Sequence, residues 1–325
     1  MLALLPVAAA GAEPDWRVGG LLFGDLYHVP SFHDEAEEGA TGVVVRRAYL
    51  TFDADFNDNW FGRLRFEANQ DGEFESYEFD ADFKDLYLGW KLGRHKLLAG
   101  LSSPPTFDLI ESEWGMRYLV RTPLDLQGVP SRETGLALSG PLDASGNWSY
   151  RAMVDAGNEF GKDTNAQRRW MGALNWKPAS AWTIDLYADH EVRDGPHDRS
   201  TWQVFAGYHT DSFRWGLQYA NQDRQDDPPL ELASAYLVAR TGENTSLVLR
   251  ADRLFEPSPR GDDIDYLPFD PSAPATMLVA GLEFAVTEQA FITPNLVLIR
   301  YGHDEQGQRP DEDLHLRLTL FLDFE

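Results

Sequence analysis

The sequence predicts an all-β fold, and three observations support this prediction. Apolar residues recur at every second position in many segments, short connections alternate with long ones, and tryptophans fall at or near segment ends. A period of two gives a strand one apolar and one polar face, whereas a helix requires a period near 3.6 residues. No stretch approaches about 18 uninterrupted apolar residues, which argues against a transmembrane helix.

Length and composition narrow the class of protein further. The 325 residues suit either two ordinary domains or one large all-β unit. The chain contains no cysteine, so neither a disulfide framework nor a zinc–thiolate site can form. A formal charge of −25 argues against nucleic acid as a partner, because binding to phosphodiesters requires a basic surface.

The amino-terminal segment indicates export from the cytoplasm. An apolar run up to Ala10 meets small residues at Gly11 and Ala12, which is typical of the end of a signal peptide, although the usual basic residues before the run are missing. We interpret residues 1–12 as a signal-peptide remnant and residues 13–325 as a single domain. A short apolar strand is the alternative interpretation of residues 1–12.

The strand pattern is clearest at the end of the chain and recurs through its body. In the last segment one face is predicted to carry Leu314, Leu316, Leu318, Leu320, Leu322 and Phe324. The segments 46–56 and 60–69 show the same alternation on both sides of the turn 57–59, and together they predict a hairpin. Counting all such segments gives about sixteen strands.

The lengths of the connections distinguish a membrane barrel from a soluble sandwich. Tight links are expected at 57–59, 93–94, 178–180, 211–212 and 241–244, and long ones near 30–41, 70–80, 103–130, 158–165, 192–199, 223–229, 256–274 and 302–312. Outer-membrane barrels have short periplasmic turns and long extracellular loops. The prediction is therefore a transmembrane antiparallel β-barrel in the bacterial outer membrane. A soluble secreted all-β binding protein is the alternative, and dependence on detergent would separate the two.

Several segments resemble the sixteen-stranded bacterial porins of the phosphate-selective porin O and P type. The likeness is carried by residues 46–67, 84–108, 131–140 and 149–161 and by the terminal aromatic strand, although Glu325 follows the aromatic Phe324. The resemblance implies a homotrimer whose third long loop folds into the lumen. The corresponding stretch here is 103–130, which would form the constriction of a channel for small hydrophilic solutes or ions.

The constriction stretch carries more acidic than basic side chains. Its predicted site residues are Asp108, Glu111, Glu113, Arg117 and Arg121, and Asp125 brings the local charge near −2, from two basic and four acidic groups. The resemblance implies lysines and an arginine ladder in the pore, yet no lysine lies in this stretch. We therefore expect weak cation selectivity or almost none. A phosphate-specific anion channel is the alternative.

Alternation also assigns charged side chains of both signs to the lumen. The basic residues predicted to line the pore are Arg47, Arg63, Arg65, Lys91, Arg151, Arg169, Arg214, Arg250 and Arg317. If the turn centres on Asp58, Asp53 lies opposite Arg63, where a cross-strand ion pair is an ordinary contact. Most of these arginines are expected to be paired, and a wall of mixed charge would sort permeants by dipole and size.

The sequence offers little support for catalysis or for a bound cofactor. It contains no G-x-S-x-G, no H-E-x-x-H and no phosphate-binding loop, so we predict neither an enzyme nor a metal or cofactor site. The acidic runs 34–38 and 71–82 are interpreted as solvated loop tips, with the capture of divalent cations as the alternative. The expected partners are outer-membrane lipid, lipopolysaccharide, further copies of the chain and the permeants.

Overall fold

The structure is a computed structural model that describes residues 13–70, 79–155, 168–193 and 195–324. The predicted signal-peptide remnant at 1–12 lies outside the described residues. The same holds for the loop expected at 158–165 and for residues 71–78 of the loop expected at 70–80.

Sixteen antiparallel strands close into a barrel, which confirms the predicted fold class and strand number. The strands are β1 (Asp15–Ser31), β2 (Thr41–Asp55), β3 (Trp60–Asn69), β4 (Asp80–Leu92), β5 (His95–Ser102), β6 (Glu133–Pro141), β7 (Trp148–Asp155), β8 (Arg168–Trp176), β9 (Trp182–Val192), β10 (Arg199–His209), β11 (Phe213–Asp223), β12 (Leu230–Arg240), β13 (Thr245–Pro257), β14 (Pro274–Ala285), β15 (Ala290–Tyr301) and β16 (Asp313–Asp323). Each strand pairs with its neighbours in sequence, and β1 closes the sheet against β16. No strand therefore has a bare edge, as a lipid-exposed sheet requires.

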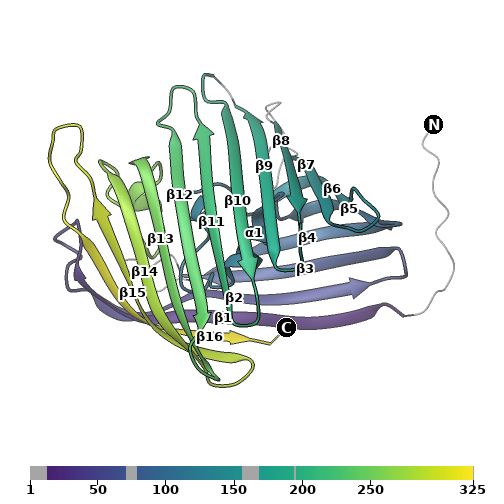
Figure 1. The fold of residues 1–325 in the computed structure, drawn as a ribbon, viewed down its shortest axis with the longest axis horizontal. Helices are drawn as coiled ribbons and strands as arrows, with labels where there is room; N and C mark the ends of the chain where they lie inside the picture. Colours follow the sequence, from purple (N-terminus) through teal and green to yellow (C-terminus); the bar gives the residue numbers. More distant parts are fainter. Residues whose placement is uncertain (1–12, 71–78, 156–167, 194, 325) are drawn as a thin grey trace.

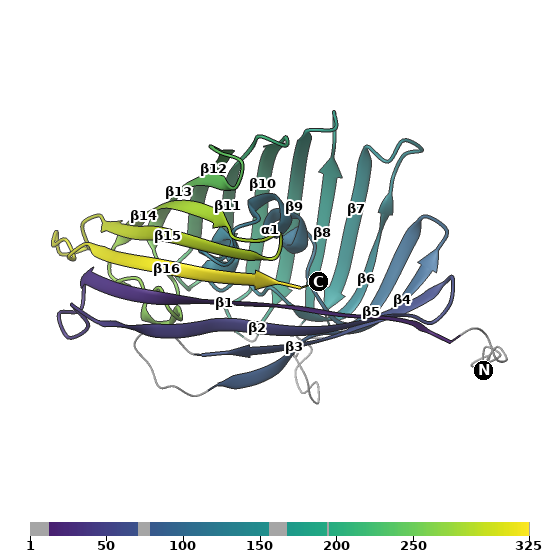
Figure 2. The ribbon, with the colours of Figure 1, turned by 90° about the horizontal axis from the view of Figure 1, so that it is seen from below.

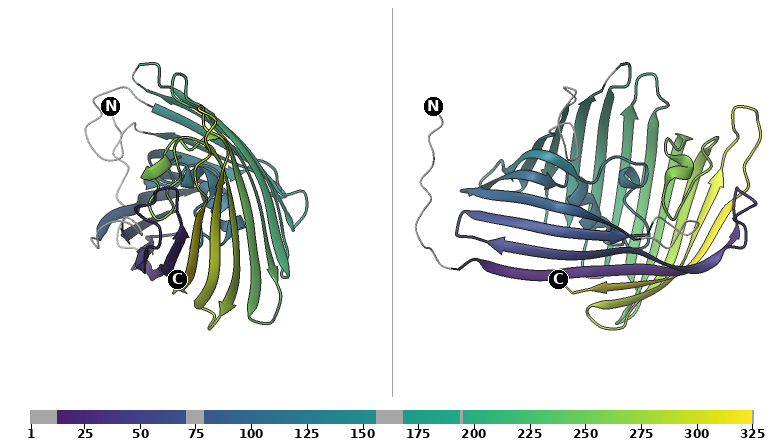
Figure 3. Two further views of the ribbon diagram at one scale, coloured as in Figure 1. Left: turned by 90° about the vertical axis from the view of Figure 1, so that its left-hand side faces the viewer. Right: turned by 180° about the vertical axis from the view of Figure 1, so that it is seen from behind.

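The barrel has two walls whose strands run in different directions. Strands β1–β4 form one wall, and in Figure 1 they cross the strands β9–β12 of the opposite wall at a steep angle. Figure 2 shows the same arrangement from below, with a helix held between the walls. The side view in Figure 3 shows the two walls facing each other, with the inward segments between them.

Long and short connections alternate around the barrel as the sequence predicts. Short links join β2 to β3, β4 to β5 and every second pair thereafter, while the longer segments 103–132 and 258–273 join β5 to β6 and β13 to β14. All short links therefore lie at one end of the barrel, together with the start of β1 and the end of β16. Stacked tryptophans mark this end, since the ring centroids of Trp60 and Trp90 lie 5.6 Å apart and those of Trp148 and Trp176 lie 5.2 Å apart.

Side chains alternate between the two faces of β16 as predicted. Leu316, Leu318 and Leu320 are exposed on the outside, whereas Arg317 and Thr319 are buried inside the barrel. The outward leucines suit a hydrocarbon surround, because leaving so many large apolar side chains in water would be costly. Among the described residues, no helix has the length and apolar character needed to cross a bilayer.

A buried carboxylate fixes the loop 32–40 onto the seam where the barrel closes. Asp313 at the start of β16 accepts a hydrogen bond from the backbone N–H of His33 at 2.7 Å, and its carboxylate lies 3.0 Å from the Nδ1 atom of the same residue. The Tyr301 hydroxyl donates to the other carboxylate oxygen. Three donors from two distant segments thus depend on one acceptor.

Removal of this acceptor should weaken the closure of the barrel. We expect Asp313→Ala to lower the free energy of unfolding by about 1–3 kcal/mol, because buried donors lose their partner. The measurement is the urea concentration at which the folded form, with its faster gel mobility, is lost. Asp311→Asn, at an exposed neighbouring position, serves as the control. Equal midpoints for both variants would contradict this account of the seam.

Candidate pore constriction

The segment 103–132 leaves the end of β5 and folds into the barrel, which confirms the predicted inward loop. It contains α1 (Phe107–Trp114) and the short α2 (Pro123–Leu126). Helix α1 starts after Thr106, whose φ of 70° is unusual for a residue other than glycine, and it ends at Gly115 with a φ of 64°. Glycine is favoured at this position by its left-handed conformation; a side chain there would also displace the movable guanidinium of Arg214.

Helix α1 is amphipathic, and its apolar face is fixed on one wall of the barrel. Phe107, Ile110 and Trp114 are buried, and the Trp114 ring lies 5.1 Å from that of Tyr236 on β12. Polar contacts fix the same orientation at the helix ends, because Thr183 on β9 donates to the Glu113 carboxylate at 2.7 Å. The opposite face of α1, which carries acidic side chains, is thereby turned toward β3–β7.

The remainder of the inward loop fills the lumen beside β12–β15. We call residues 116–129 together with 258–273 the lumen plug. Its buried apolar members are Met116, Tyr118, Leu119, Val120, Leu124, Leu126, Val129, Ile264, Tyr266, Leu267, Phe269 and Ala273. They pack against inward apolar side chains of the wall, among them Leu232, Met277 and Val297. The plug thus fills much of the lumen on this side, and a cavity of about 650 Å³ remains between it and the end of the barrel with the short links, where Arg214, Arg240 and Glu283 are among the lining residues.

The open side of the lumen contains a polar cavity of about 650 Å³. Its lining includes Asp108 of α1, Arg151 of β7, Asn175 of β8 and the exposed Lys96 of β5. The loop and three strands of the wall thus enclose a water-accessible space at the level of α1.

Of the five predicted constriction residues, Asp108 is the one that lines this space. The Asp108 side chain is 55% exposed and lies between Arg151, at 3.4 Å, and Arg132, at 3.9 Å. Burial by itself would raise the pKa of Asp108, but Arg132 and Arg151 outweigh it, so the pKa lies below its ordinary value and the group is charged at neutral pH. The Glu111 side chain, one helical turn along, is 31% exposed.

Arg117 and Arg121 lie inside the lumen plug rather than against the open cavity. The Arg117 side chain is 10% exposed and pairs with Asp125 at 2.5 Å and with Glu111 at 2.8 Å. The Arg121 side chain is 7% exposed and pairs at 2.7 Å with Asp265, which belongs to the other segment of the plug. Burial would raise the pKa of Asp125, but the charges of Arg117 and Arg121 outweigh it and hold the pKa well below its usual range.

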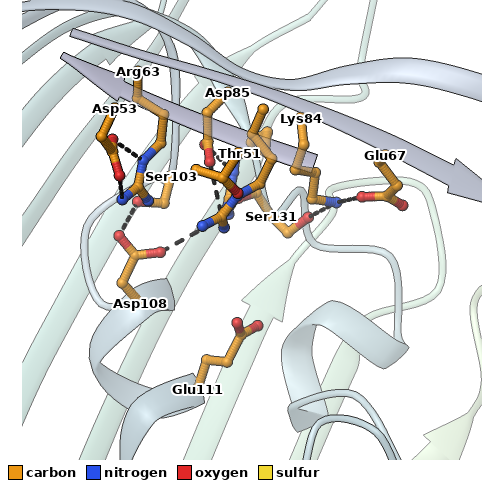
Figure 4. A network of polar contacts seen from close by, with 12 residues as sticks. Thr51, Asp53, Arg63, Glu67, Lys84, Asp85, Ser103, Asp108, Glu111 and Ser131 are labelled. Carbon is orange, nitrogen blue, oxygen red and sulfur yellow. Dashed lines mark hydrogen bonds and ion pairs between the residues drawn. The ribbon is translucent and has the colours of Figure 1, made fainter. Parts of the chain in front are cut away.

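On the wall facing α1, cationic side chains alternate with carboxylates (Figure 4). Arg63 forms a bidentate pair with Asp53, at 2.8 and 2.9 Å, across the register that the hairpin predicts. Asp85 lies between Arg132, at 2.7 Å, and Arg65, at 3.5 Å. The acidic face of α1 thus lies opposite a row of guanidinium groups, each of which also has a carboxylate neighbour on the wall or the loop.

The other predicted pore-lining residues all lie on the inner face, but several are enclosed. Lys91 pairs with Asp55 at 3.2 Å, and Arg250 pairs with Asp252 at 2.5 Å. Arg169 pairs with Glu133 at 2.9 Å and with Asp189 at 2.7 Å, and Arg47 contacts Glu67. Arg214 lies against Gly115, and Arg317 donates to the backbone carbonyl of Tyr266. Arg47, Arg169, Arg250 and Arg317 are buried. Most of these cations therefore pair with carboxylates of the wall, and Arg214 and Arg317 contact the inward loops.

Two inward cations do not follow the alternation, because each occupies a β-bulge. Arg46 is the extra residue between Val45 and Arg47, where the register of β2 against β1 shifts, and Lys84 is the extra residue where β4 shifts against β3. Each bulge turns a second consecutive side chain inward. The adjacent arginines at 46 and 47 are the one available signal, because strict alternation would place one of them in lipid at a high cost.

Arg46 is the main polar anchor of the lumen plug. Its Nε lies 2.6 Å from the Asp25 carboxylate on β1, and both side chains are fully buried. The same guanidinium donates to the backbone carbonyl of Leu119 at 3.1 Å and to that of Tyr118. It also lies 4.9 Å from the centre of the Tyr266 ring. One side chain thus joins the wall to both segments of the plug.

Among the described residues, no group of three or more histidine, aspartate or glutamate side chains is arranged to hold a metal ion. Residues 71–78 of the second acidic run lie outside the described part of the chain. The interpretation of that run, as a solvated tip or a cation trap, stays a prediction.

The sequence matches no protein-family model and no curated protein. Its fold, however, is that of bacterial porins. The anion-selective porin from Comamonas acidovorans has a TM-score of 0.67 at 13% identity, with 96% of this chain and 100% of that chain covered. The outer membrane channel DcaP of Acinetobacter baumannii gives 0.67 at 10% identity over 98% and 100%. OmpF of Salmonella typhi gives 0.64 at 10% identity over 94% and 97%.

Loss of the Arg46 anchor should loosen the lumen plug. We expect Arg46→Gln to lower the free energy of unfolding by about 3–5 kcal/mol, because Asp25 loses its buried cationic partner. Digestion by chymotrypsin near Tyr118 should also become faster. Both effects are measured on the detergent-solubilised barrel. Arg17→Gln, which removes an arginine from an exposed pair, should leave both quantities unchanged. Protection of the plug in Arg46→Gln would show that apolar packing alone holds it.

Proposed function

We propose that this protein is an outer-membrane porin, a passive diffusion channel for small hydrophilic solutes and ions. The supporting observation is a closed barrel with an apolar outer surface whose polar lumen is narrowed, but not filled, by its own third loop. A soluble secreted binding protein, the alternative from the sequence, would leave the outward leucines of β16 and its neighbours in water. Dependence on detergent separates these two functions.

We infer that the channel selects only weakly among permeants by their net charge. Asp108 on α1 is opposed by Arg132 and Arg151, and the cavity beside it contains side chains of both signs. Opposed rows of charge create a field across the path rather than along it, which orients dipolar solutes. Almost no ion preference therefore fits this geometry better than a marked cation preference.

The closer relation to the phosphate-selective porins O and P, the homotrimer and the signal peptide remain proposals. The first is supported by the resembling segments and the second by a structural neighbour described as the trimer form of OmpT from Vibrio cholerae. A phosphate-specific channel is the weaker candidate, because Arg151, which lines the cavity, and Arg132 both have the Asp108 carboxylate as a neighbour. We expect phosphate to permeate without tight binding.

Neutralisation of Asp108 provides a direct test of the constriction. We expect Asp108→Asn to shift the reversal potential in a KCl gradient toward anion selectivity, because Arg132 and Arg151 lose the carboxylate between them. Asp58→Asn, at an exposed turn, should leave the reversal potential of the parent unchanged. A strong anion preference of the parent, with block by phosphate, would contradict the proposed weak selectivity and favour the phosphate channel.

The orientation in the membrane can be tested by single cysteines, since the chain has none of its own. We expect a membrane-impermeant maleimide to label Gln306→Cys, in the loop between β15 and β16, on intact cells. Ser212→Cys, in a short turn at the other end, should react only after lysis. Labelling of Ser212→Cys on intact cells would contradict the assignment of the short turns to the periplasm.

A further inference from the structure

The outer face of the barrel contains a shallow apolar groove across β10–β15. It consists of two cavities, of about 460 and 520 Å³, that share Ala235 of β12 and Ala251 of β13. These two alanines are partners in the register of the two strands. The cavities therefore form one continuous groove across the middle of the outward surface.

Small side chains create this groove, and larger ones bound it. Its floor is formed by Ala206, Ala233, Ala235, Ala251 and Ala280, and its sides by Val204, Leu217, Leu237, Leu249, Leu278, Leu296 and Leu298. A depression of this kind takes a narrow, unbranched apolar group, because bulky groups cannot reach the alanine floor. An extended acyl chain has that shape.

A cation lies at the end of the groove nearer the long loops. Arg253 lines the groove from β13, two positions after Ala251, and donates to the hydroxyl of Thr276 at 3.0 Å. Within the described parts of the chain, no carboxylate pairs with Arg253. A guanidinium binds phosphate oxygens through several N–H groups at once. This arginine therefore has free donors beside an apolar groove.

We propose that the groove is a binding site for a phosphorylated, acylated lipid of the outer leaflet. One acyl chain occupies the alanine floor, and the phosphate of the headgroup is held by Arg253. The proposal rests on the proposed location in the outer membrane, where the end of β13 that carries Arg253 reaches the outer surface. Such a lipid satisfies the apolar groove and the cation together, whereas an apolar surface of a second copy would leave Arg253 without an anion.

Native mass spectrometry of the full chain in detergent, with added lipid A, tests the proposal. We expect Arg253→Gln to lower the occupancy of lipid A about tenfold, because a charge-assisted hydrogen bond is lost. Ala251→Leu, which fills the floor of the groove, should have a similar effect. The matched controls are Arg309→Gln, in the exposed loop between β15 and β16, and Ala188→Leu, on the outer face of β9. Both controls should bind lipid A like the parent.

Two further probes separate the possible occupants. Phosphatidylcholine should bind less than lipid A, since its cationic choline opposes Arg253, and inorganic phosphate alone should leave no adduct. Equal binding of lipid A by all variants, or retention of inorganic phosphate, would overturn the proposal. A change of oligomer mass in Ala251→Leu without a change in bound lipid would assign the groove to a second copy instead. Channel conductance of the parent, measured separately in bilayers, distinguishes a failure of this site from a failure of the proposed function.

Discussion

The closed sheet imposes the constraint on which the rest of the structure depends. Because β1 pairs with β16, every strand has one face toward the surroundings and one toward the lumen. The outward face is apolar, so nearly all charged strand residues must share a confined interior, where an unpaired charge is costly. The pairs of Asp25 with Arg46 and of Arg169 with Glu133 and Asp189 follow from this confinement.

The two halves of the interior differ in polarity. Inward residues of β12–β15 such as Met277 and Val297 are apolar, and they bind the lumen plug, while the inner faces of β2–β7 are charged. An amphipathic helix between such walls has one stable orientation, with Trp114 toward the apolar half and Asp108 toward the charged half. The narrowing of the lumen is therefore a consequence of packing, and the position of the acidic face is set by residues that never meet a permeant.

The strand pattern could be predicted from sequence because side-chain alternation depends on local geometry alone. The faces of β16, the alternating loop lengths and the Asp53 to Arg63 pair all follow from it. Bulges break this local rule, so alternation does not assign Arg46 and Lys84 to the lumen. The burial of Arg121 depends on Asp265, which lies far away in the sequence and meets it only after both loops fold inward. No count of charges within 103–130 contains that information.

The backbone of the inward loop explains why so many arginines line this barrel. Irregular backbone inside a barrel has carbonyl groups without ladder partners, and each needs a donor. Guanidinium groups from the wall supply these donors: Arg46 to Tyr118 and Leu119, Arg250 to Arg121 at 2.7 Å, Arg151 to Ser103 at 2.5 Å, and Arg317 to Tyr266. A guanidinium can do this and pair with a carboxylate at once, which an ammonium group does less well. Four of the inward arginines thus support loop backbone, so the number of arginines in such a lumen is a poor guide to anion selectivity.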